Sequence, residues 1–89
     1  MVFLLGYDPP TKAEVAEALA NIGATILQPI RQDHWLVRST PQGIRSLHEQ
    51  LPSTTSVSMT QAGRTTGWQC ALVERAFQLC RDMNIFCYR

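Results

Sequence analysis

The first part of the chain shows two different patterns of apolar positions. Residues 2–7 are nearly all apolar and are followed by Asp8 and two prolines, which cannot continue a strand ladder. Thr11, with Glu14 three residues later, is typical of a helix start, and Gly23 is typical of a helix end. Between them, apolar side chains recur at helical spacing at Val15, Leu19 and Ile22. The pattern predicts a buried strand followed by a helix.

The next segment has the pattern of a β-hairpin. Residues 25–30 form a mostly apolar run in which Pro29 favours an edge or a bulge, and residues 34–39 form a second run. Along the second run, Trp35 and Val37 alternate with residues of the opposite face. Only a short polar connection separates the two runs, so we expect adjacent antiparallel strands.

A second helix and a further strand follow. Thr40 and Pro41 combine an N-cap residue with proline at the first helical position, and Pro52 ends the helical pattern. Residues 54–60 are rich in Ser and Thr but place Val57 and Met59 on one face, which indicates a strand with one wet side. Apolar positions at Leu72, Val73, Ala76, Phe77 and Cys80 then predict an amphipathic helix over residues 69–83.

The order of these elements is β-α-β-β-α-β, which predicts an α+β, ferredoxin-like fold with an antiparallel sheet. The chain should form a single domain over residues 1–89, with a core at about 2–60 and a C-terminal helix and tail at about 68–89. A short last strand over residues 85–88 is also expected. Two helices would cover one face of the sheet. The other face must be open, covered by a partner, or covered by the last helix.

Composition excludes some functional classes and leaves others open. Apolar residues make up 45% of the chain and charged residues 17%, which is globular rather than disordered. The net charge of +1 provides no general basic field for nucleic acid. However, Arg accounts for all the basic residues except Lys12, and Arg is suited to bidentate contacts with phosphate. Arg31, Arg38 and Arg64 are therefore candidate binding residues, with ordinary solvated surface as the alternative.

The three cysteines, Cys70, Cys80 and Cys87, lie close to the end of the sequence, and their spacing is not that of a zinc site. The opening apolar run is too short for a signal peptide, and no segment is long enough to span a bilayer. We therefore expect a cytoplasmic protein without membrane contact, whose cysteines are reduced and buried.

Asp8 is the first candidate for chemistry because it follows the first strand at a turn that the prolines enforce. A carboxylate there can hold a divalent cation, especially beside a second copy, but Asp also commonly caps turns. His34 and His48 have no spacing that pairs them, so we expect ordinary surface or half-buried roles. The loop at residues 63–68 could bind phosphate through its backbone and Arg64. The alternative is a surface loop with Trp68 packed as an anchor.

Several segments together resemble a known family. Residues 2–8, 34–40 and 56–60, with the later Gly67 and Trp68, are similar in order to strands of the small CRISPR-associated endoribonucleases, the dimeric partners of the CRISPR integrase. The similarity is greatest to the SinR-like branch and covers roughly residues 2–68. Two features depart from the pattern. Pro9, Pro10 and Thr11 replace basic residues, and the chain continues into a long helix from Gln69.

The resemblance implies a ferredoxin-like homodimer whose C-terminal segment adds to the sheet of the partner. It also implies a phosphodiesterase site at which Asp8, matching the family's metal-binding Asp, holds Mg²⁺ or Mn²⁺. The leading hypothesis is thus a dimeric protein that interacts with nucleic acid or with a nucleic-acid-processing complex. The alternative is a non-enzymatic module that binds a protein partner, as an inhibitor or regulator, through its open sheet face or last helix. Whether the chain is an enzyme stays open at this point.

Overall fold

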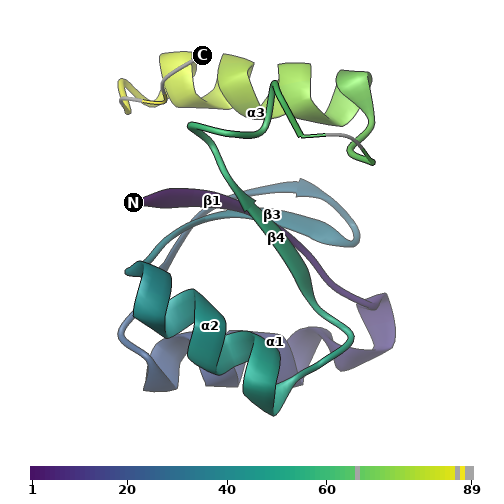
Figure 1. Cartoon of the computed structure of the whole chain (residues 1–89), viewed down its shortest axis with the longest axis vertical. Helices are drawn as coiled ribbons and strands as arrows, with labels where there is room; N and C mark the ends of the chain where they lie inside the picture. Colours follow the sequence, from purple (N-terminus) through teal and green to yellow (C-terminus); the bar gives the residue numbers. More distant parts are fainter. Residues whose placement is uncertain (66, 86, 88–89) are drawn as a thin grey trace.

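A computed structural model describes residues 1–65, 67–85 and 87 of the chain. Its elements are β1 (Val2–Gly6), η1 (Pro9–Thr11), α1 (Lys12–Asn21), β2 (Thr25–Arg31), β3 (His34–Arg38), α2 (Pro41–Gln50), β4 (Thr55–Ser58) and α3 (Cys70–Asp82). The strands form one four-stranded antiparallel sheet in the order β2-β3-β1-β4 (Figure 1). The predicted α+β, ferredoxin-like arrangement with an extra C-terminal helix is confirmed.

The central strands are those with the most apolar sequences. In β1 and β3, Leu4 lies opposite Leu36, and both side chains are fully buried. β2 is at an edge, and its register with β3 shifts next to Pro29, as a residue without a backbone N–H requires. Sequence pattern and position in the sheet therefore agree, because burial on both faces needs continuous apolar runs.

One face of the sheet packs against α1 and α2. Trp35 and Val37 of β3 point to this side, as their alternation predicts. The buried residues of this layer are Phe3, Leu5, Tyr7, Val15, Ala18, Leu19, Trp35, Val37, Ile44 and Leu47. At the start of α2, the Thr40 side chain accepts a hydrogen bond from the Gly43 amide at 3.0 Å, which is the predicted N-cap. At α1 the expected capping box is absent, since Thr11 instead donates its hydroxyl to the Asp8 carbonyl.

The other face of the sheet is covered by α3, which lies across it on the side away from α1 and α2 (Figure 1). The buried residues of this second layer are Leu4, Leu36, Val57, Met59, Ala62, Leu72, Val73, Ala76, Phe77, Leu79 and Cys80. Of the three arrangements that the sequence allowed, the chain thus uses its own last helix. The apolar sheet face is therefore not open, and it no longer supports the expectation of a homodimer.

The end of α3 corrects the prediction about the cysteines. Asn84 has a φ of 55°, and the amides of Ile85 and Asn84 bond to the carbonyls of Cys80 and Arg81 at 2.8 and 3.1 Å. This is a Schellman motif, which turns the chain back along the helix. Cys87 thereby reaches Cys80, with a Cα–Cα distance of 6.1 Å, and the two form a disulfide.

The prediction of reduced cysteines is therefore wrong for this pair, because spacing along the sequence does not show the return of the chain. The predicted burial of Cys80 is confirmed, whereas Cys70 is a free, exposed thiol at the first residue of α3. The predicted last strand includes residues 86 and 88, which lie outside the described residues, and residues 85 and 87 belong to no strand.

In the described part of the chain, no helix combines the length and apolarity needed to cross a bilayer.

Candidate functional site

One row of residues runs across all four strands near the end of the sheet. The register places Arg31 of β2 opposite His34 of β3, His34 opposite Gly6 of β1, and Gly6 opposite Thr55 of β4. Residues directly opposite each other project to the same face of a sheet. We call these four residues the cross-strand row. It brings together polar side chains from segments that are far apart in the sequence.

Gly6 provides the space in which the row closes over β1. A Cβ atom at Gly6 would lie 2.8 Å from Thr55 Oγ1 and 3.0 Å from His34 Nε2. These distances are shorter than van der Waals contact, so a larger residue would push both side chains away. The glycine at the end of this apolar strand is thus explained by the close approach of two polar groups.

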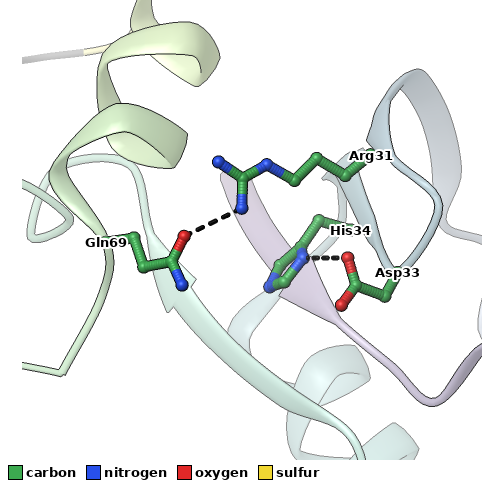
Figure 2. Close-up of polar contacts among 4 residues, drawn as sticks. All are labelled: Arg31, Asp33, His34 and Gln69. Atoms are coloured by element: carbon green, nitrogen blue, oxygen red, sulfur yellow. Dashed lines mark hydrogen bonds and ion pairs between the residues drawn. The ribbon is translucent and has the colours of Figure 1, made fainter.

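The orientation of His34 is determined by the residue before it. His34 Nδ1 lies 2.7 Å from Asp33 Oδ1, and since a carboxylate only accepts, Nδ1 carries the proton and donates it (Figure 2). This hydrogen bond is the largest cause that lowers the pKa of Asp33. In the neutral ring, Nε2 is then an acceptor. The Asp33 carbonyl also accepts the Tyr7 amide at 2.9 Å, which ties the hairpin turn to the end of β1.

The loop before α3 packs over the cross-strand row. Arg31 Nη1 donates to Gln69 Oε1 at 2.8 Å, and Figure 2 shows this contact beside His34. The rings of His34 and Trp68 meet edge to face, with centroids 5.9 Å apart. Between the row and the loop lies a pocket of about 380 Å³, which we call the Trp68 pocket. It is lined by His34, Thr55, Ser56, Gly67, Trp68, Gln69 and Leu72.

Trp68 also borders a second pocket, of about 480 Å³. That pocket is lined by Thr60, Ala62, Gly63, Arg64, Thr65, Trp68, Cys70, Val73 and Glu74. The indole packs against the α3-side core, which agrees with the predicted role of an anchor. At the same time it presents ring surface to two concavities. Trp68 is therefore both a packing residue and the wall between two pockets.

The other histidine, His48 of α2, has a closed environment. The Thr54 hydroxyl donates to the Leu51 carbonyl at 2.7 Å, so it must accept from His48 Nδ1–H, also at 2.7 Å. His48 Nε2 then accepts from the Ser56 hydroxyl at 2.7 Å. Burial lowers the pKa of His48, which favours this neutral form. Both ring nitrogens are thus used in joining α2 to β4.

Asp8 lies just beyond β1 and is exposed. Its backbone carbonyl accepts hydrogen bonds from the Thr11 amide and hydroxyl, each at 2.8 Å, but its carboxylate makes no capping bond. Within the described residues, the His, Cys, Asp and Glu side chains form no group of three or more that could hold a metal ion. A cation at Asp8 would therefore need further ligands, from water, substrate or a second copy.

The three candidate arginines occupy different places. Arg31 belongs to the cross-strand row, and Arg64 lines the pocket on the other side of Trp68. Arg38 lies at the opposite end of β3, beside Val2 and Thr25, where it is exposed. The structure thus brings two of the three arginines close to Trp68 and separates the third from them.

Sequence reasoning missed Asp33, Thr55 and Gln69 as members of one site. The available signals were Gly6 within an apolar strand and the adjacent Asp33 and His34 in a hairpin turn. Comparisons of the chain with models of protein families, with curated proteins and with solved structures find no match. Function is therefore argued from the geometry of the pockets.

Proposed function

We propose that the chain binds single-stranded nucleic acid at the Trp68 pocket. The observation that supports this most is that an imidazole, a hydroxyl and an indole line one pocket, while the Arg31 guanidinium is hydrogen-bonded to Gln69 of the same lining. Phosphate is recognised by Arg and by hydroxyl groups, and unpaired bases stack on aromatic rings. The four groups match the parts of one nucleotide.

Each group has a defined role in the proposal. Among the described residues, the Arg31 side chain donates one hydrogen bond, to Gln69, and its other donors are available to a phosphate. Trp68 offers ring surface to a base, and Thr55 offers a hydroxyl to phosphate or sugar. α3 begins at Cys70, next to Gln69, so the partial positive charge of its first turn adds to the attraction for an anion.

The low net charge limits where the binding affinity can come from. With a net charge of +1, affinity must come from a few specific contacts rather than from a broad basic surface. Because α3 covers the centre of the sheet, bases are accommodated at its end and not across its face. The site is formed by one chain, so binding does not require the homodimer that the family resemblance implies.

The test is fluorescence anisotropy with labelled single-stranded RNA, single-stranded DNA and duplex DNA. Arg31→Ala should weaken single-strand binding about tenfold, because one charge-assisted contact is lost. It should also reduce the slope of log affinity against log salt by about 0.7, the value for one phosphate contact. Arg45→Ala, at an exposed position of α2 on the other side of the sheet, is the matched control and should change neither quantity.

Two further outcomes have separate meanings. Equal losses in Arg31→Ala and Arg38→Ala would indicate general charge attraction and contradict a site at the Trp68 pocket. An absence of binding to any nucleic acid would favour the protein-binding alternative, through the exposed side of α3. Cleavage that needs Mg²⁺ or Mn²⁺ and is lost in Asp8→Asn would support the metal-dependent phosphodiesterase that the resemblance implies.

A further inference from the structure

We propose that His34, held in position by Asp33, is a general base that cleaves RNA bound in the Trp68 pocket by way of the RNA's own 2′-hydroxyl. This inference rests on the proposed function, since RNA must first bind. It adds a reaction and a substrate class. It also differs from cleavage at Asp8, because no metal ion takes part.

The imidazole of His34 is held in one tautomer. The hydrogen bond of 2.7 Å to Asp33 places the ring proton on Nδ1 and leaves the lone pair on Nε2. Among the described residues, Nε2 of His34 has no hydrogen-bond partner. A carboxylate that holds an imidazole in one tautomer, with the other nitrogen available, is the arrangement that general bases use.

The position of the His34 ring also suits a general base. The His34 side chain is 19% exposed, and the ring borders the Trp68 pocket. The absence of a side chain at Gly6 lets Nε2 approach β1 beside Thr55. Arg31 is directly opposite His34 in the register, and its guanidinium donates to Gln69, a residue that lines the pocket. A proton acceptor and a phosphate-binding cation are thus neighbours.

RNA is the substrate because it carries its own nucleophile, the 2′-hydroxyl. Cleavage through the 2′-hydroxyl needs a base for one proton and a cation for the phosphate, but no nucleophile from the protein. The proton of the 2′-hydroxyl moves to His34 Nε2, and the 2′-oxygen bonds to the adjacent phosphorus. The bond from phosphorus to the 5′-oxygen breaks, and that oxygen takes a proton from water. The products are a 2′,3′-cyclic phosphate and a 5′-hydroxyl, and the imidazolium returns its proton to solvent.

Two charged and two neutral side chains lie around the His34 ring. Asp33 is bonded to the ring, and Arg31 lies across from it on β2. Thr55 and Trp68, which border the ring from β4 and from the loop, are neutral. Among these neighbours, the acidic group holds the ring in place and the basic group is the candidate ligand for phosphate.

The experiment uses the full chain and one single-stranded sequence in three forms: RNA, DNA and 2′-O-methyl RNA. Binding is measured by anisotropy and cleavage by gel, each with and without EDTA. All three strands should bind, only RNA should be cut, and EDTA should have no effect. His34→Gln should slow cleavage at least a hundredfold, the usual contribution of a general base, with affinity changed only a few-fold.

Asp33→Asn tests the positioning residue. The amide can still accept a hydrogen bond, but without the charge the cleavage rate should fall while the affinity for RNA stays the same, a split that a merely structural role would not cause. Circular dichroism of each variant shows that it is folded.

RNA that binds but is not cut would overturn this inference and leave the proposed function intact. The inference would also be overturned by His34→Gln cutting at the wild-type rate, or by cleavage that requires Mg²⁺ and Asp8. An absence of RNA binding would overturn both proposals.

Discussion

The two histidines lie on opposite sides of the sheet, in environments that differ in one decisive way. On the α2 side, His48 has Thr54 on one nitrogen and Ser56 on the other. On the α3 side, His34 has Asp33 on one nitrogen, while the rest of the ring borders a pocket. The same side chain is therefore a connection between elements in one place and an available group in the other.

The difference shows why hydrogen-bond satisfaction is a better guide to function than residue type. A buried polar group whose donors and acceptors are all used contributes to stability and leaves nothing for a ligand. A side chain that is held by one hydrogen bond and has another polar atom facing a pocket contributes less to stability, and that atom is available to a ligand. His48 therefore stabilises the fold, and His34 is the histidine that can act on a ligand.

The largest expected effect is the stability difference between the two alanine variants. His48→Ala should lower the free energy of unfolding by about 2–3 kcal/mol, because it removes a partner of the buried Thr54 and the half-buried Ser56. His34→Ala should cost less, about 1 kcal/mol, since it removes a partly exposed hydrogen bond to Asp33 and the edge contact with Trp68. Urea unfolding measures both. Equal costs would remove the distinction between the two sites.

The disulfide on the α3 side should have the next largest effect. Cys87→Ser should lower the free energy of unfolding by about 2 kcal/mol, as expected for a short closed loop. The wild type should lose the same amount when a reductant is added, and the variant should lose nothing further. In the native protein, a thiol reagent should modify Cys70 alone, and mass spectrometry can count the modified residues. Labelling of three cysteines would contradict the pairing.

A methyl group at Gly6 should disturb the α3 side selectively. Gly6→Ala should lower the free energy of unfolding by about 1–2 kcal/mol, because the new Cβ meets Thr55 and His34 at 2.8 and 3.0 Å. Adding Thr55→Ala removes one of these contacts and should recover part of the loss. A double variant that is no more stable than Gly6→Ala alone would show that the hydroxyl is not the obstacle.

The smallest effect concerns pH and the α2 side. Burial lowers the pKa of folded His48 below the unfolded value of about 6.5, so the unfolded state binds the proton more readily. Stability should therefore be greatest above about pH 6.5 and decrease as pH falls from there towards the folded pKa. His48→Gln should flatten this part of the curve, as followed by thermal unfolding. An unchanged slope in the variant would assign the effect to another group.

The sequence predicted the elements and their faces well, because these depend on local patterns. The alternation of Trp35 and Val37 and the capping by Thr40 are properties of neighbouring residues, and both are confirmed. The cross-strand row is different, since Arg31, His34, Gly6 and Thr55 meet only through the registers of three strand pairs. Registers and the return of Cys87 to Cys80 depend on long-range packing that periodicity does not show.

The most direct test of the account follows both histidines in one experiment. A ¹H–¹⁵N spectrum with indole, guanidinium and imidazole signals assigned is recorded while single-stranded RNA is added. The account predicts shifts of the Trp68 indole, the Arg31 guanidinium and the His34 ring, with no shift of the His48 ring. Shifts of His48 and the α1 and α2 surface, with Trp68 and His34 unchanged, would contradict it.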